Sequence, residues 1–385
     1  MDHSRSFHPA SPLLGSCVPS LPALSYYDPG CFAEELKTIW GRAWIYAGRA
    51  NNLPAMTLRR LSAAGQNLIL IKDQDGAISC FHNTCRHRGA ELCSAQEKRL
   101  ESRLITCPYH QWTYALSGEL AGTALMTPTA DFKKPEHSLF AVHVREWNGF
   151  LFVCLADEPP DFASTPDLGL AVYDNWPMRE LVTGHTMVRE LKCNWKIFWE
   201  NYNECLHCPS IHPGLCDMVP VYRKGIMSYD EASDWTPEAP RPTRNLKPGA
   251  RTWTVNGQVC GAEFPLLTDA ERAAGYHFVT LLPSLFVVAH VDYVRAVSLR
   301  PLGPETTELR AEWLFPRTTL EAPGFDLSNV VDFAAKIILE DGEACELNQR
   351  GVRCSRFSSG TLVPQEYAIF QFHEWVRTVT KEVRS

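Results

Sequence analysis

Two cysteine–histidine pairs constrain this chain more than any other feature, because only a specific arrangement of loops can bring four such side chains together. The first pair is Cys85 and His87, and the second is Cys107 and His110. Two thiolates and two imidazoles can hold one zinc ion or one [2Fe–2S] cluster. Zinc sites usually keep Cys with Cys and His with His, whereas this order lets two similar loops meet. The order therefore favours a cluster with both cysteines on one iron and both histidines on the other.

The residues around the two pairs fit the same interpretation. Gly89 and Pro108 suit tight loops whose backbone N–H groups approach bridging sulfurs. The Rieske cluster motif is similar to two runs of this sequence, Cys85-x-His87-Arg88-Gly89 and Cys107-Pro108-Tyr109-His110-x-Trp112, and Tyr114 and Gly118 extend the match. Neutral imidazoles in place of two thiolates raise the cluster's potential. The resemblance thus implies a [2Fe–2S] cluster that a flavin or ferredoxin donor can reduce.

A second candidate metal site lies in residues 200–213, which contain Glu204, His207 and His212. Two histidines and one carboxylate on one face of a metal leave three positions open, as in non-haem Fe(II) oxygenases. The Cys-x-x-Cys spacing of residues 205–208 could instead bind zinc or act as a redox dithiol. The stretch alone leaves these alternatives open. A neighbouring cluster that moves single electrons favours iron.

The two motifs together, in this order and at this separation, resemble the catalytic α-subunit of the Rieske non-haem iron oxygenases, the aromatic-ring-hydroxylating oxygenase family. The resemblance covers nearly the full chain. The family's pattern of an acid, two residues, His, four residues and His falls on Glu204, His207 and His212. It implies that both histidines bind iron. It also implies that Glu204 bridges electrons to a cluster histidine of a neighbouring subunit in a ring-shaped homotrimer.

The third iron ligand is expected from an acidic run near the end of the chain. Asp341 aligns best with the family's liganding aspartate, and Glu340 and Glu343 are the alternatives. A helix can point only some of these acids at one metal. We therefore predict His207, His212 and Asp341 as the mononuclear iron ligands.

Several features are most similar to the branch of the family that oxidises quaternary ammonium compounds, namely the glycine betaine, stachydrine and carnitine oxygenases. Most ring-dihydroxylating members carry Asp at the position of Glu204, and the residues 200–213, 292–294 and 312–315 resemble the quaternary-ammonium branch. The implied reaction is oxidative N-demethylation of a small betaine-like compound with release of formaldehyde. The alternative is monooxygenation or dihydroxylation of an aromatic or heterocyclic compound.

A permanent cation favours an aromatic cage as its binding site. The chain has eleven Trp and twelve Tyr residues, so a cage is possible, but these numbers do not locate it. Tyr202, Trp253 and Tyr293 are the candidate cage residues, and each would also suit a hydrophobic core.

The pattern of elements predicts an α+β protein with two domains. Short β-branched runs broken by turn signals in residues 44–156 predict a small all-β Rieske domain. Residues 157–385 mix strands with helices, and the resemblance implies a helix-grip catalytic domain, in which helices pack on an antiparallel sheet. The Pro-rich, acidic residues 157–166 are the expected linker. Residues 1–43 are expected to form a loose arm up to about residue 25 and then a helix from 29 that packs on the catalytic domain.

Within the catalytic domain, hydrophobic periodicity predicts a helix over 194–207 and a final long helix over 327–349. The buried stripe of the final helix should comprise Val330, Phe333, Ala334, Ile337, Ile338 and Leu347. Residues 225–260 are irregular and suit a loop over a site. Strands are expected at 276–282, 285–290, 295–299 and 308–315, with the last three forming an antiparallel meander around a turn at 301–304.

Composition excludes several classes of function. A net charge of −7 and scattered basic residues argue against nucleic-acid binding. The chain has no apolar run long enough for a membrane span and no signal-like N-terminus, so we expect a cytoplasmic protein whose fourteen cysteines are mostly reduced.

A non-catalytic electron carrier is a further alternative, but it would need only about the first 155 residues. A second domain with its own iron ligands argues against it. The sequence contains no Gly-rich dinucleotide or flavin motif. With O₂ as co-substrate, the electrons of NAD(P)H must therefore come through a separate flavin or ferredoxin-type reductase.

Overall fold

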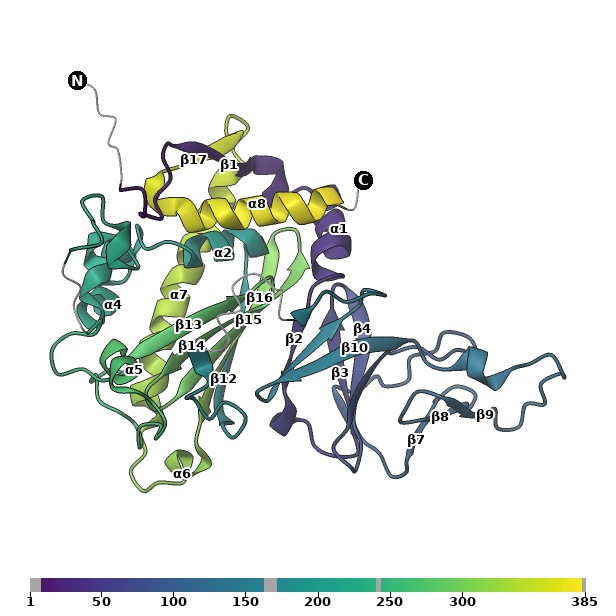
Figure 1. Cartoon of the computed structure of the whole chain (residues 1–385). Helices are drawn as coiled ribbons and strands as arrows, with labels where there is room; N and C mark the ends of the chain where they lie inside the picture. The colour runs from purple at the N-terminus through teal and green to yellow at the C-terminus, as the bar shows by residue number, and fades with distance from the viewer. Residues whose placement is uncertain (1–7, 163–171, 240–243, 383–385) are drawn as a thin grey trace. The chain divides into compact units, whose positions relative to one another are not determined.

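A computed structural model describes residues 8–162, 172–239 and 244–382. The chain divides into two compact units (Figure 1). The larger unit comprises residues 1–39, 166–281 and 285–385, and the smaller comprises residues 40–165 and 282–284. The N-terminal segment is thus part of the larger unit. The expected linker at 157–166 lies partly outside the described residues.

The smaller unit is built from short antiparallel strands, as predicted. A seven-stranded sheet has the order β2-β11-β10-β5-β4-β3-β6, and a three-stranded sheet has the order β7-β8-β9. A single hydrophobic core joins Ile69 and Phe81 to the predicted cluster cysteines. The elements are β2 (Ile45–Arg49), η3 (Ala50–Asn52), β3 (Thr57–Ala63), β4 (Gln66–Lys72), β5 (Ile78–His82), β6 (Glu97–Arg99), β7 (Leu104–Thr106), β8 (Thr113–Ala115), β9 (Leu120–Gly122), η4 (Lys134–His137), β10 (Ala141–Trp147) and β11 (Phe150–Cys154).

The larger unit contains a five-stranded antiparallel sheet with the order β12-β16-β15-β14-β13. The predicted meander is confirmed, with its β15–β16 turn at residues 304–305 rather than 301–304. The edge strand β12 was not predicted. The strands are β12 (Val182–Leu191), β13 (Tyr276–Leu281), β14 (Leu285–His290), β15 (Val294–Gly303) and β16 (Thr306–Phe315).

Helices pack on this sheet, and α7 (Leu327–Val352) carries Asp341 of the candidate site. Helix α2 (Trp195–Tyr202) contacts α7, α8 (Tyr367–Glu382) and β15, and α7 also contacts β12 (Figure 1). The prediction of a final helix at 327–349 missed α8. The remaining elements of this unit are α3 (Cys208–Ile211), α4 (Pro213–Met218), η7 (Pro220–Lys224), η8 (Tyr229–Glu231), α5 (Asp269–Ala274), α6 (Arg317–Leu320) and η9 (Pro364–Glu366).

The buried stripe of α7 was predicted correctly except for Phe333, which is only half-buried, and for its last residue. Val330, Ala334, Ile337 and Ile338 are buried, whereas Leu347 is 65% exposed. Val352 is buried instead, because the helix continues past residue 349.

The N-terminal segment is more ordered than predicted. Strand β1 (Val18–Pro22) pairs with β17 (Ser359–Leu362), so these residues are not a loose arm. After η1 (Ala23–Tyr26), Asp28 caps α1 (Pro29–Glu35), which continues as the π-helix η2 (Leu36–Trp40). Within the described parts of the chain, no helix combines the length and apolar character needed to span a bilayer.

Candidate metal centres

The two cysteine–histidine pairs lie on loops with the same backbone hydrogen bonds. The Cys85 N–H donates to the carbonyl of Ala90 at 2.8 Å, and the Cys107 N–H donates to the carbonyl of Trp112 at 2.8 Å. The residue four positions after each cysteine donates back to that cysteine's carbonyl. These residues, Gly89 and Gln111, both have a left-handed backbone, with φ of 75° and 57°. The predicted similarity of the two loops is therefore present in the backbone.

The side chains of these loops suit a [2Fe–2S] cluster. Cys85 and Cys107 are buried, and neither is in a disulfide. The ring centroids of His87 and His110 are 4.7 Å apart, and the buried Nδ1 of His87 has no hydrogen-bond partner among the described residues. The hydroxyl of Tyr114 lies 3.1 Å from Cys85 Sγ. Free thiols beside an unpartnered imidazole nitrogen form a donor set that fits the cluster.

The second candidate site is on a turn, not on the helix predicted for residues 194–207. Helix α2 ends at Tyr202, and Asn203 is its C-cap. The carboxylate of Glu204 accepts hydrogen bonds from the backbone N–H groups of Leu206 and His207, which holds the chain in a turn. Pro209 then lies in the first turn of α3, where its missing N–H costs nothing. The prediction that this helix extends to residue 207 was therefore wrong.

Three side chains converge across this turn and α7. Ligand atoms of His207, His212 and Asp341 all lie within 4.8 Å of one another. Asp341 Oδ1 is 2.8 Å from His212 Nε2 and 3.4 Å from His207 Nε2. Two imidazole nitrogens and a carboxylate oxygen facing one point fit a mononuclear iron with open positions.

Each histidine of this triad is oriented by a second carboxylate. His207 Nδ1 lies 2.5 Å from Glu204 Oε1, and His212 Nδ1 lies 2.8 Å from Glu340 Oε2. Such contacts fix the tautomer and ring orientation of a metal-binding histidine. Glu340, one of the two alternative iron ligands, instead contacts the ring nitrogen of His212 that faces away from Asp341. Glu343, the other alternative, is exposed.

The carboxylates also control the protonation of the histidines. Burial by itself lowers the pKa of His207, but hydrogen bonds and charge from Asp341 and Glu204 outweigh burial and raise it to about 9. Burial likewise lowers the pKa of His212, and Asp341 and Glu340 reverse the direction and raise it. Without a metal, the triad therefore holds protons that a bound cation must displace.

The triad opens on a small, mostly apolar cavity whose walls include several aromatic rings. Its volume is about 100 Å³, against about 300–1,000 Å³ for typical ligand pockets. Tyr202 and Trp253, both predicted as cage residues, line it. Tyr293 does not, and its hydroxyl donates to the Trp253 carbonyl at 2.6 Å.

The irregular segment expected to cover a site, residues 225–260, contributes Met227 as well as Trp253 to the cavity walls. Arg295 also lines the cavity, and no sequence motif marks it.

The Cys-x-x-Cys pair forms a disulfide between Cys205 and Cys208. In this state neither sulfur is available as a thiolate ligand. The zinc alternative for these two residues is therefore not supported by the structure.

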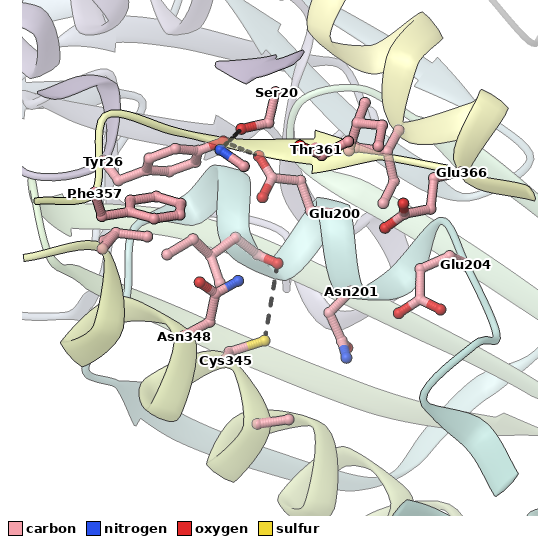
Figure 2. A pocket seen from close by; sticks show the side chains of 16 residues that line it. Ser20, Tyr26, Glu200, Asn201, Glu204, Cys345, Asn348, Phe357, Thr361 and Glu366 are labelled. Atoms are coloured by element: carbon pink, nitrogen blue, oxygen red, sulfur yellow. Dashed lines mark hydrogen bonds between the residues drawn. The ribbon is translucent and has the colours of Figure 1, made fainter. Parts of the chain in front are cut away.

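Glu204 also lines a second pocket, of about 330 Å³ (Figure 2). Glu200 and Glu366 contribute further carboxyl groups, and the Tyr26 hydroxyl donates to Glu200 at 2.7 Å. Burial raises the pKa of Glu366, and the charges of Glu204 and Glu200 raise it further. Among the described residues, only Glu204 and Asn201 line both this pocket and the metal cavity.

Comparison with known proteins identifies the family. Residues 178–382 match the family described as ring hydroxylating alpha subunit (catalytic domain), and residues 43–133 match the Rieske [2Fe-2S] domain. The chain belongs to the Rieske ring-hydroxylating oxygenase alpha subunits. The oxygenase is accordingly an oxidoreductase with a Rieske cluster and a mononuclear non-haem iron. The assignment of individual ligands stays a prediction that the geometry supports.

One curated relative aligns with most of the oxygenase, and another aligns with about half of it. It is 31% identical to the glycine betaine monooxygenase oxygenase subunit of Chromohalobacter salexigens over 92% of this chain and 84% of that protein. It is 33% identical to the carnitine monooxygenase oxygenase subunit of Acinetobacter baumannii over 52% of this chain and 55% of that protein. Among solved structures, a quaternary ammonium Rieske monooxygenase in complex with L-carnitine has a TM-score of 0.72 at 22% identity, covering 95% of this chain and 96% of that chain. The last likeness establishes the fold alone.

Proposed function

We propose that this oxygenase uses O₂ to demethylate a small quaternary ammonium compound of the betaine type. The observation that carries the proposal is the small cavity, lined in part by aromatic rings, onto which His207, His212 and Asp341 open. Aromatic faces attract a cation that cannot donate hydrogen bonds, by about 0.5–2 kcal/mol per good contact. The 31% identity with a glycine betaine monooxygenase oxygenase subunit supports the same class of substrate.

The proposed reaction balances with one O₂, two electrons and two protons. One oxygen atom enters a C–H bond of an N-methyl group, and the other leaves as water. The resulting N-hydroxymethyl compound loses formaldehyde and a proton, which leaves a tertiary amine. Iron on the triad supplies open positions for O₂ beside the substrate. The aromatic walls hold the ammonium group and exclude water, while Glu204 and Glu340 hold the two histidines in place.

Glu204 is the proposed bridge for electrons that arrive from another subunit. One of its carboxylate oxygens lies against His207 Nδ1, and its side chain also lines the pocket of Figure 2. We infer that a cluster histidine of a neighbouring chain reaches the carboxylate from the side of this pocket. The proposal therefore includes a homotrimer and a separate flavin or ferredoxin-type reductase that oxidises NAD(P)H. The relatives' designation as oxygenase subunits supports a separate reductase.

The test is product analysis with the purified oxygenase, a Rieske-oxygenase reductase, NADH and O₂. Glycine betaine, carnitine, stachydrine and naphthalene are compared as substrates. We expect one formaldehyde and one tertiary amine for each O₂ consumed with at least one of the three betaines. A hydroxylated ring product from naphthalene, with no formaldehyde from any betaine, would contradict the proposal.

A further inference from the structure

Arg295 is a buried cation without an ionic partner in the part of the chain that the structure describes. It is the second residue of β15 and is only 5% exposed. Its Nε and Nη1 atoms have no hydrogen-bond partner among the described residues, and no described carboxylate lies within 4.0 Å of its guanidinium. Lys196, another buried cation of this unit, has a partner by contrast, because its Nζ lies 2.6 Å from Glu35 Oε1. The fold therefore pairs Lys196 and leaves Arg295 without an ionic partner among the described residues.

An unpaired guanidinium in this position calls for an explanation, because a buried charge is unfavourable unless it is paired and hydrogen-bonded. The planar group presents a fork of N–H donors whose best partner is the two oxygens of a carboxylate. Among the described residues, the Trp253 ring faces the guanidinium, and its centroid is 5.8 Å from Arg295 Cζ. An aromatic face leaves the in-plane N–H groups free. A partner in the plane of the guanidinium is therefore missing.

The position of Arg295 indicates where that partner comes from. Its side chain lines the same cavity as His207, His212 and Asp341. Its cross-strand neighbour is Val288 of β14, which also lines the cavity. Apart from the metal triad and Glu204, the walls are uncharged, with aromatic rings from residues such as Tyr202 and Phe286. The free donors of the guanidinium thus belong to the proposed substrate cavity.

We propose that Arg295 binds the carboxylate of the substrate, so that the cavity selects a small zwitterion in which a carboxylate accompanies the quaternary ammonium group. This inference rests on the proposed function and narrows it. The carboxylate on Arg295 anchors one end of the molecule, and the aromatic walls receive the methylated nitrogen beside the triad. A substrate with a hydroxyl in place of the carboxylate, such as choline, leaves the guanidinium unpaired and brings a second positive charge toward it.

The experiment measures equilibrium binding to the reduced holoenzyme without O₂, by dialysis of labelled ligands. Three ligands of similar shape are compared: glycine betaine, choline, and 3,3-dimethylbutyrate, which keeps the carboxylate but replaces the ammonium by a neutral tert-butyl group. Each is tested with wild-type protein, Arg295→Met, Arg295→Lys and the control Arg300→Gln. Arg300 lies on the same strand but pairs with Glu308 at the surface.

We expect wild-type protein to bind glycine betaine about 10- to 100-fold more tightly than choline, as a charge-assisted hydrogen-bonded pair allows. Arg295→Met should lose this preference, because it should weaken the binding of glycine betaine and 3,3-dimethylbutyrate and leave the binding of choline unchanged. Arg295→Lys, which keeps the charge but not the fork, should lose part of it. Arg300→Gln should bind as wild type. Equal affinity of wild-type protein for glycine betaine and choline, or an equal loss of both in Arg295→Met, would overturn the proposal.

The third ligand separates this inference from the proposed function. If 3,3-dimethylbutyrate binds as tightly as glycine betaine and both depend on Arg295, the anion site stands and the quaternary ammonium proposal fails. If the ammonium ligands bind regardless of Arg295, the proposed function stands and the anion site fails. Thermal melting of the ligand-free variants controls for folding. Because Arg295 has no ionic partner among the described residues of the ligand-free protein, the melting temperature of Arg295→Met should equal or exceed that of the wild type. If that variant does not fold, the wild-type preference for glycine betaine over choline decides.

Discussion

His212 depends on Glu340 more than the sequence indicates. Glu340 Oε2 lies 2.8 Å from His212 Nδ1, while Nε2 of the same ring faces Asp341. Replacing Glu340 by Gln removes the negative charge that makes this imidazole a better ligand. We expect affinity for mononuclear iron to fall about 10- to 100-fold, with the Rieske spectrum unchanged. Anaerobic iron titration followed by metal analysis measures the loss.

The matched control for this variant is Glu343→Gln, because Glu343 is on the same helix but exposed. It should bind iron as the wild type does. Equal losses in the two variants would mean that the charge of the helix, rather than the contact with His212, supports the metal.

Iron affinity should increase with pH, because the triad holds protons without iron. Asp341 and Glu204 outweigh the effect of burial and raise the pKa of His207 from 6.5 to about 9. A ligating imidazole must be neutral, so iron binding releases this proton. Release of this one proton should make the affinity increase about tenfold per pH unit up to about pH 9, with a smaller slope above it.

The same pKa shift has the opposite effect on the metal-free protein. A pKa raised on folding contributes stability that is fully present below pH 6.5 and is lost as the pH rises through about 9. Anaerobic iron titrations and melts of the metal-free protein across this range measure both trends. An iron affinity that does not change with pH would show that His207 is already neutral in the metal-free site.

Motif spacing was enough to predict the residues whose chemistry is local. His207 and His212 are five positions apart in one turn, and Asp341 was found from the acidic run that resembles the family's. Glu340 and Arg295 were missed as partners for a physical reason. Their roles depend on which side of α7 faces the turn and on which face of β15 lines the cavity, and both follow from tertiary packing that no local pattern encodes.

The buried ion pair between α1 and α2 should be important for the stability of the larger unit. Lys196 Nζ lies 2.6 Å from Glu35 Oε1, the two side chains are 0% and 6% exposed, and the indole of Trp195 donates to the other oxygen of Glu35. Glu35→Gln leaves the buried ammonium without a counter-charge. We expect a loss of about 3–5 kcal/mol in the free energy of unfolding, measured by urea denaturation.

The double variant Glu35→Gln with Lys196→Met is the control for this prediction. Removing both charges also removes the desolvation penalty, so its stability should recover most of the loss. A double variant that is as unstable as Glu35→Gln would attribute the effect to packing or to the Trp195 hydrogen bond.

Elements with a clear periodicity were predicted better than elements whose ends are set by side chains. The strands of the meander and helix α7 were predicted from their patterns. Helix α2 is shorter than predicted because the carboxylate of Glu204 hydrogen-bonds to the following backbone and competes with helix continuation. The first half of β12 shows no regular alternation of buried and exposed residues, which explains why this edge strand was missed.

The division of the whole chain was predicted from the change between short β-branched runs in residues 44–156 and mixed strands and helices after them. The small β unit and the larger α+β unit agree with the predicted fold class. The sequence did not indicate that β1 pairs with β17, which ties the N-terminal segment to the larger unit. Pairing between segments so far apart in sequence leaves no local signal.

The proposed trimer makes a prediction about mixed assemblies. Asp341→Ala should lose the mononuclear iron and keep the cluster, whereas His110→Ala should lose the cluster and keep the iron site. If electrons pass between neighbouring subunits, each variant is inactive alone, but co-expression restores activity. With random assembly in equal amounts, half of the iron sites are intact and half of these have an intact cluster beside them, so about a quarter of wild-type activity is expected.

Transfer within one chain leads to different results in the same assay. Co-expression of the two single variants would then give no activity, because no chain has both centres. Wild-type chains mixed equally with the double variant would retain about half of the activity if transfer is within a chain, and about a quarter if it is between neighbours. Metal analysis and size measurement of each preparation verify that the variants lose only the intended centre and still assemble. The pair of ratios, rather than either activity alone, therefore decides whether Glu204 receives electrons from its own chain or from the next.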